Sequence, residues 1–154
     1  MKVLIWLLPL LLPRAVRWAE AQEALILAGG SPLSERELAD ARVMGVTHPE
    51  RIRVLQVATV PLPLHPLLRG IAHASGLLSP HTVGMALGYG IFIRQDFRGH
   101  RTIIAHECVH VGQYERLGGF RPFLRQYVTE CLEHGYPQAP LEQEAVLRSA
   151  TVTG

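Results

Sequence analysis

Cysteine is scarce in this sequence, because Cys108 and Cys131 are the only two among 154 residues. Two cysteines are too few for the network of disulfides that holds small secreted domains together. Free cysteine is, in addition, one of the residue types that is most often buried. We therefore predict that both are packed thiols and that a hydrophobic core holds the fold together.

A strong charge of one sign is also missing. The formal net charge is +2 with neutral histidines, and the 15 basic residues are scattered along the chain. Proteins that bind nucleic acid usually gather their basic residues into a patch or stripe that follows the phosphates. We therefore expect no nucleic acid partner.

Neither an internal repeat nor a low-complexity segment is visible in the sequence. Hydrophobic residues make up 48% of the chain and charged residues 18%, a balance that can bury a core. A chain of 154 residues has room for one compact domain, and not comfortably for two. We therefore expect one core and one site.

The N-terminal apolar run, from Val3 to Leu12, is too short to span a bilayer as a relaxed helix. It follows Lys2 and resembles the core of a secretory signal, and Ala19-Glu20-Ala21 resembles a cleavage site. The residues before that triplet are untypical of a signal, however; they are Pro9, Pro13, Arg14 and Arg17.

We divide the chain into an N-terminal apolar segment, residues 1–20, and a single domain, residues 21–154. A first helix docked on a cytoplasmic protein is slightly favoured over export or membrane attachment. Membrane association through residues 1–14 stays open as an alternative.

Glycine, proline and the apolar pattern predict mainly helices with two strands. Helix is expected over residues 14–27, 34–45, 64–76, 102–117, 122–134 and 140–148, and strand over 51–60 and 85–94. Ser34 and Glu37 fit a capping box at the start of the second helix. Thr102 is the expected N-cap of the fourth helix, which should end before Gly118.

The fourth of these helices contains His106-Glu107-Cys108-Val109-His110. Two histidines four residues apart project from one helical face and can bind the same metal ion. Glu107 is turned away from that ion but can reach a water in an open position, which makes it the candidate general base. Zinc lowers the pKa of such a water to about 7, so the pattern predicts zinc-dependent hydrolysis of an amide bond.

A catalytic zinc ion normally has three protein ligands, so a third is needed. Gln113 and Arg116 stand where the metzincin pattern requires Gly and His, which excludes that class. Asp40 and Asp96, the only aspartates, precede the motif. The remaining candidates downstream are Glu115, Glu130, Glu133, His134, Glu142 and Glu144.

We predict Glu144 as the third ligand. Leu141, Glu144 and Ala145 share one helical face, and the two apolar residues indicate that this face is buried. A buried carboxylate needs a partner, which zinc would provide. Glu142 is the second choice, because an acid in a first helical turn complements the helix dipole without any metal.

The other candidates have simpler explanations. Glu115 lies about 140° around the helix from His110. Glu130 and Glu133 fit solvated acids on a helix surface, and His134 fits a residue of a helix C-terminus.

Three blocks of sequence resemble small bacterial gluzincin-type zinc metallopeptidase domains: residues 104–116, residues 140–145 and, before them, Leu87 to Ile93. The resemblance implies a minimal zincin-like α+β fold, with a small antiparallel or mixed sheet packed on the motif helix. It also implies zinc held by His106, His110 and Glu144, with Glu107 as base. The substrate would be a peptide or protein, added as a β-strand along the edge Tyr89 to Arg94.

Two features of the sequence keep other functions open. The chain has little material for a second lobe that would form a deep cleft, and the oxyanion donor could be Tyr127, Tyr136 or His134. One alternative is a weak or inactive zinc-binding module that holds a protein partner. Another is a membrane-associated accessory protein in which the first residues are the functional part.

Overall fold

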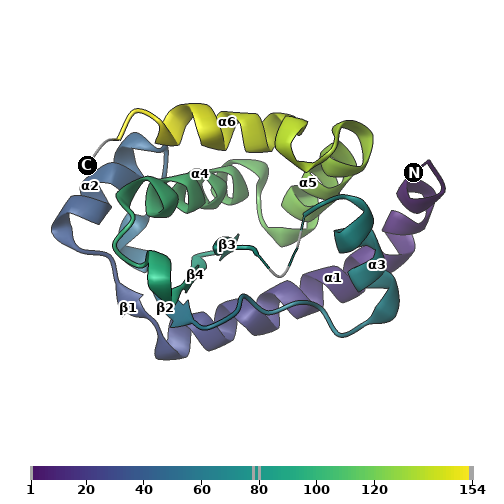
Figure 1. The fold of residues 1–154 in the computed structure, drawn as a ribbon, viewed down its shortest axis with the longest axis horizontal. Helices are drawn as coiled ribbons and strands as arrows, with labels where there is room; N and C mark the ends of the chain where they lie inside the picture. Colours follow the sequence, from purple (N-terminus) through teal and green to yellow (C-terminus); the bar gives the residue numbers. More distant parts are fainter. Residues whose placement is uncertain (1, 78, 80, 153–154) are drawn as a thin grey trace.

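The computed structural model of the protein describes residues 2–77, 79 and 81–152. Within these residues, six α-helices and a four-stranded mixed sheet form an α+β fold (Figure 1), the class that the resemblance implies. The helices are α1 (Lys2–Gly29), α2 (Glu35–Val43), α3 (Pro66–Ala74), α4 (Arg101–Leu117), α5 (Phe120–His134) and α6 (Pro140–Ser149). The strands are β1 (Ser31–Pro32), β2 (Arg53–Val57), β3 (Gly84–Leu87) and β4 (Gly90–Arg94), and short 3-10 turns cover Pro49–Arg51, Gln95–Phe97 and Tyr136–Gln138.

The sheet has the strand order β1-β2-β4-β3, and β4 lies in its interior. β4 runs parallel to β2, with Arg53 opposite Gly90, and antiparallel to β3. The prediction of one strand over 85–94 was therefore wrong. Gly88 adopts a left-handed conformation, with φ of 62°, and turns the segment into a hairpin.

The pairing of β4 with β2 and β3 also corrects the prediction that the substrate binds along the strand edge Tyr89 to Arg94. Tyr89 to Arg94 is not an edge, because β4 is hydrogen-bonded on both sides. In the described part of the chain β3 is paired on one side only. An edge near the motif helix is thus provided by β3.

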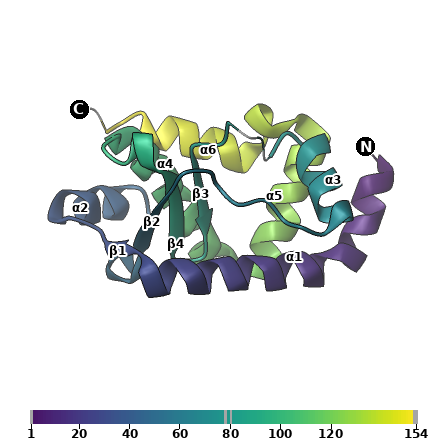
Figure 2. The ribbon, with the colours of Figure 1, turned by 60° about the horizontal axis from the view of Figure 1, so that its bottom comes forward.

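Two layers of helices enclose the sheet (Figure 2). Ile91 and Ile93 of β4 pack on the motif-bearing helix α4, in a cluster that includes Ile104 and Val109. Phe92, which points to the other face, packs with Ile26 of α1. The alternation follows from the two-residue period of a strand.

Helix boundaries agree largely with the sequence signals. The capping box of Ser34 and Glu37 is present, and Gly118 ends α4 with φ of 98°. Thr102 is not the N-cap of α4, because His100 occupies that position and the Thr102 hydroxyl donates to the Val152 carbonyl. Cys108 and Cys131 are both free and buried, as predicted.

Helix α1 runs from Lys2 to Gly29 and therefore continues through residue 20. Its first half packs on α3 and α5, where Leu8 and Leu11 meet Ile71, Val128 and Leu132. Among the described residues, no helix combines the length and the apolar character needed to cross a membrane.

Candidate metal centre

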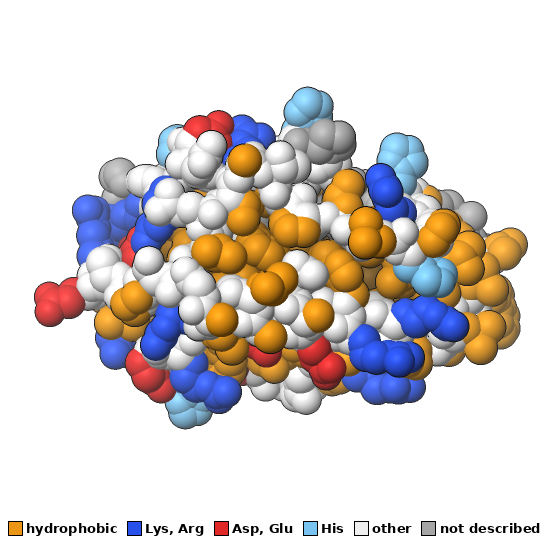
Figure 3. Space-filling view, turned by 90° about the horizontal axis from the view of Figure 1, so that it is seen from below, with side chains coloured by type: hydrophobic (Ala, Val, Ile, Leu, Met, Phe, Trp, Pro, Cys, Tyr) orange, Lys and Arg blue, Asp and Glu red, His pale blue; other side chains and the backbone are white. Residues whose placement is uncertain are grey.

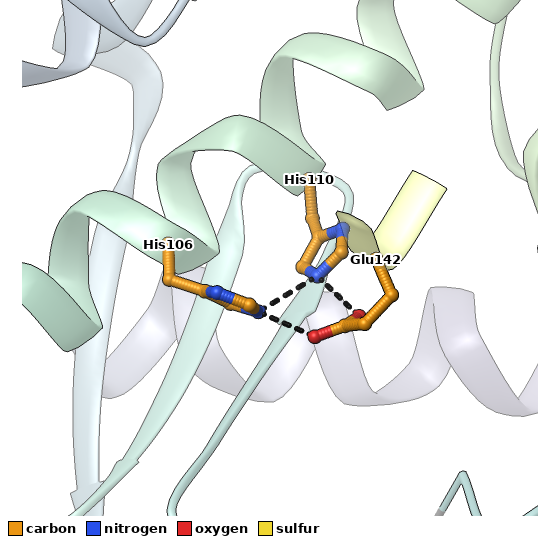
Figure 4. Close-up of side chains that lie close together, drawn as sticks. All are labelled: His106, His110 and Glu142. Carbon is orange, nitrogen blue, oxygen red and sulfur yellow. Dashed lines mark hydrogen bonds and ion pairs between the residues drawn. The ribbon is translucent and has the colours of Figure 1, made fainter. Parts of the chain in front are cut away.

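His106 and His110 project from the same side of α4, one turn apart, as the sequence predicted (Figure 4). Their Nε2 atoms are 3.3 Å apart. The opposite side of the helix is held by the core through Ala105 and Cys108. Packing of that apolar side orients both imidazoles away from the sheet core and toward α6.

Glu142, in the first turn of α6, completes the group. Its Oε1 atom is 2.8 Å from Nε2 of His106 and its Oε2 atom is 3.2 Å from Nε2 of His110. One ligand atom from each of the three residues lies within 4.8 Å of the other two. Nitrogen and oxygen ligands at tetrahedral zinc distances lie about 3.3 Å from one another, so both the donor set and its spacing suit this ion.

Glu144, the predicted third ligand, lies elsewhere. Its carboxylate accepts from both terminal nitrogens of Arg116, at 3.2 and 3.1 Å, and its side chain is 30% exposed. The prediction that Glu144 is the buried acid of this helix was wrong. The buried face of α6 contains Leu141, Glu142, Ala145 and Ser149, and Glu142 is only 2% exposed.

The remaining acids proposed from sequence have structural roles. Glu115 accepts hydrogen bonds from the backbone amides of Thr47 and His48 and from the Tyr89 hydroxyl. Glu130 accepts from the Leu141 amide. Glu133 is half exposed, 3.9 Å from His134. The structure brings none of these side chains to the two histidines.

A buried glutamine fixes the orientation of His110. Gln113 Oε1 lies 2.8 Å from Nδ1 of His110, and Gln113 Nε2 donates to the Leu141 carbonyl at 2.9 Å. Because that carbonyl can only accept, the amide orientation is defined, and Nδ1 of His110 must be the donor. Nε2 of the neutral ring then carries the lone pair that a metal ion needs, whereas a doubly protonated ring donates from Nε2 to Glu142.

The role of Gln113 was missed at the sequence level, where the residue served only to exclude the metzincin class. Gln113 is 0% exposed, one helical turn after His110. A fully buried amide requires hydrogen-bond partners, and this one has them in the His110 ring and the Leu141 carbonyl. Burial could not be read from the sequence, since Gln is usually exposed.

Two tyrosine hydroxyls hold the Glu142 carboxylate from the other side. Tyr127 donates to Oε2 at 2.8 Å and Tyr136 to Oε1 at 3.0 Å. Burial and the Glu142 charge raise the pKa of both phenols, so both remain protonated donors. Burial alone would raise the pKa of Glu142, but hydrogen bonds from His106 and His110 outweigh it and hold the pKa well below its ordinary value.

Glu107 is also buried and faces strand β3. A Cβ atom on Gly84 would lie 2.8 Å from Glu107 Oε1, so glycine at that position leaves room for the carboxylate. Burial raises the pKa of Glu107, against the opposing effect of the two histidines. A carboxylate with a raised pKa is suited to accept and return a proton near neutral pH.

A cavity of about 630 Å³ opens beside these residues. His106, Glu107 and Tyr136 line it, together with the β3 edge and apolar side chains such as Leu77 and Phe123. Its size is in the range of ligand-binding pockets. The two histidine ligands and the candidate base therefore line one largely apolar cavity.

Comparisons with family models, with curated proteins and with solved structures find no match to this chain.

Proposed function

We propose that this protein is a zinc-dependent peptidase that hydrolyses an amide bond of a peptide or protein. The observation that carries the proposal is the His106–His110–Glu142 group beside Glu107 at the wall of a cavity. The resemblance of the motif to gluzincin-type metallopeptidases supports it. Zinc, when bound, supplies Lewis acidity and makes water a stronger acid.

In this proposal, different residues of the site have different chemical roles. Glu107 accepts the proton of the attacking water and returns it to the leaving amine. Gln113 holds the tautomer of His110, and Tyr127 holds the carboxylate of Glu142. Tyr136 lines the cavity, and we assign it as the donor to the developing oxyanion, a role in which its hydroxyl turns from Glu142 to the substrate.

The substrate chain is placed along β3 in this proposal. The free edge of β3 lies beside the site, and Gly84, Met85 and Ala86 line the same cavity as His106 and Glu107. An extended peptide gains backbone hydrogen bonds by adding to such an edge, and its alternate side chains enter neighbouring pockets. The apolar lining favours substrates with hydrophobic side chains near the cleaved bond.

The test is a pair of measurements on Glu107→Gln. The amide keeps the shape of the side chain and cannot take a proton from water, so zinc content should stay at about one ion per chain while hydrolysis is lost. Metal analysis and a peptide-library cleavage assay report the two quantities. A mutant that cleaves as fast as the parent would rule out the assigned base.

A zinc-binding module that holds a protein partner in the same cavity is the second candidate. Both tyrosine hydroxyls near the site donate to Glu142 rather than into the cavity, an arrangement that stabilises the ligand instead of a transition state. Turnover by the zinc-loaded parent separates the two candidates, because a binding module takes up zinc and cleaves nothing.

A further inference from the structure

Large apolar side chains are exposed at the end of the molecule where α1 begins. Val3, Trp6 and Leu10 lie on one face of α1 at spacings of three and four residues, and Trp6 is 83% exposed. Leu64, which is 86% exposed, and Leu67 lie at the start of α3, at the same end (Figure 1). Figure 3 shows hydrophobic side chains gathered at this end. Single exposed leucines are ordinary, whereas a cluster of this kind marks an interaction surface.

Basic residues border this apolar surface. Arg14 and Arg17 continue the face of Val3, Trp6 and Leu10 along α1, and both are exposed. Arg69 is exposed on α3. None of these three arginines forms an ion pair within the described residues. Residues 2–19 and 58–77, which contain the first part of α1 and all of α3, include no Asp or Glu.

A cleft of about 530 Å³ lies between these basic and apolar groups. Arg14, Arg17, His65 and Leu68 are among the residues that line it. Nδ1 of His65 is buried and lacks a hydrogen-bond partner in the described part of the chain. Two guanidinium groups and an unsatisfied imidazole at an apolar cleft match the chemistry of a phosphate that carries hydrocarbon chains.

We propose that this end of the protein docks on the surface of a bilayer that contains anionic phospholipid. Trp6 and its apolar neighbours enter the interface, where tryptophan is favoured. Arg14 and Arg17 follow Leu10 on the same face of the helix, where their guanidinium groups can reach the phosphates beside the apolar surface. The proposal is independent of zinc and of the proposed peptidase activity.

The charges favour a lipid surface over a second copy of the chain. A two-fold dimer through this face would bring the same patches together, and with them the arginines of both copies. The described acids of the neighbouring helix α5 have other neighbours: Glu130 accepts from Gln126 and Leu141, and Glu133 lies beside His134. An anionic bilayer instead provides the opposite charge over the whole face.

The experiment measures co-sedimentation of the 154-residue chain with vesicles of pure phosphatidylcholine, and with vesicles of equal parts phosphatidylcholine and phosphatidylglycerol. We expect binding to the mixed vesicles, weakened by added salt, and at least about tenfold weaker binding to the neutral ones. Equal binding to both compositions, or none to either, would overturn the proposal.

Two sets of variants separate the apolar and the basic contributions. Trp6→Ser, and Arg14→Gln with Arg17→Gln, should each weaken binding at least about tenfold. Leu25→Ser is the matched apolar control, an exposed leucine at the other end of the same helix. Arg36→Gln with Arg42→Gln on α2 is the matched charge control, because this double variant has the same net charge as Arg14→Gln with Arg17→Gln. The assignment is contradicted if the control variants lose binding as strongly as the test variants. It is also contradicted if the protein binds no vesicles but forms a dimer that Trp6→Ser dissociates.

Discussion

Glu142 and Glu144 are two residues apart on α6 and have different partners. Glu142 meets the two histidines, whereas Glu144 meets Arg116. We predict that Glu142→Ala weakens zinc binding at least about a hundredfold, because two imidazoles and water replace a three-ligand site. Zinc affinity of the purified variant, measured by competition with a chelator, checks this.

Glu144→Ala is the matched comparison. It removes a partly exposed ion pair with Arg116 and should cost about 0–1 kcal/mol of stability with zinc affinity unchanged. Loss of zinc from Glu144→Ala and its retention in Glu142→Ala would show that the helix presents its other side to the histidines in solution.

The choice between these two acids could not be made from the apolar pattern alone. Leu141 and Ala145 define the middle of a helical stripe, and Glu142 and Glu144 lie on its two sides at about equal angles, about 60° or 100° from each apolar residue. Ser149, about 20° from Glu142, is buried in the structure, but serine is usually exposed, so its burial could not be read from the sequence. The placement of His106 and His110 on one face was predictable, because it follows from the helix period alone.

At the scale of secondary-structure elements, Gln113 connects the metal-binding face of α4 to the start of α6. The side-chain amide of Gln113 is hydrogen-bonded to His110 and to the carbonyl of Leu141, which precedes Glu142. We predict that Gln113→Leu weakens zinc binding about 10–100-fold, the usual effect of removing a group that orients a ligand. In the metal-free protein, at a pH where His110 is neutral, nitrogen NMR of His110 should show loss of the single Nδ1-protonated tautomer.

Gln126→Leu on the exposed side of α5 serves as control, and should leave both the tautomer and the affinity unchanged. A variant of Gln113 that keeps the His110 tautomer but loses stability would indicate a packing role only.

Helix α2 is joined to the start of α4 by Asp40 and Arg101. Arg101 Nε and Nη2 donate to the two carboxylate oxygens at 2.7 and 2.8 Å. These hydrogen bonds lower the pKa of Asp40, against the opposing effect of burial. We predict that Asp40→Asn lowers the free energy of unfolding by about 1–3 kcal/mol near neutral pH.

The pH dependence of that loss has a defined sign. A carboxyl with a lowered pKa in the folded state contributes stability above its ordinary pKa of about 4, and loses it as the pH falls through the folded value. Urea denaturation should therefore show the difference between parent and Asp40→Asn shrinking as the pH is lowered from about 5 to about 3. Asp96→Asn, which removes the exposed ion pair of Asp96 with Arg94, is the control for the loss of a carboxylate at the surface. A difference that stays constant over this range contradicts the assigned role.

Elements with local signals were predictable and those set by distant partners were not. The capping box at Ser34 and the glycine after α4 act within a few residues, and both appear as expected. The interior position of β4 depends on parallel pairing with β2, more than 30 residues earlier, and the sequence around β4 does not show that partner. Gly88, where the segment turns, was a local signal that the prediction of one strand did not use as a turn.

At the scale of the whole molecule, the site is assembled from two separate parts of the chain. Packing of α4 on the sheet fixes His106 and His110, and packing of α6 on α4 fixes Glu142. Residues 111–141 separate the last two ligands and include all of α5. The complete ligand set therefore exists only when these three helices are folded together.

Zinc should for this reason stabilise the whole fold. The unfolded chain cannot hold the three ligands at one point, so binding energy adds to folding energy. At a free zinc concentration about 100 times the Kd, the gain is about 2.7 kcal/mol, which corresponds to a rise of about 5–10 °C in Tm for a chain of this size. Thermal unfolding with zinc, with chelator and with magnesium measures the shift, which we expect from zinc alone because the nitrogen ligands do not suit magnesium. Glu142→Ala should unfold at the same temperature with and without zinc. An equal rise in that variant would place the stabilising zinc at a different site.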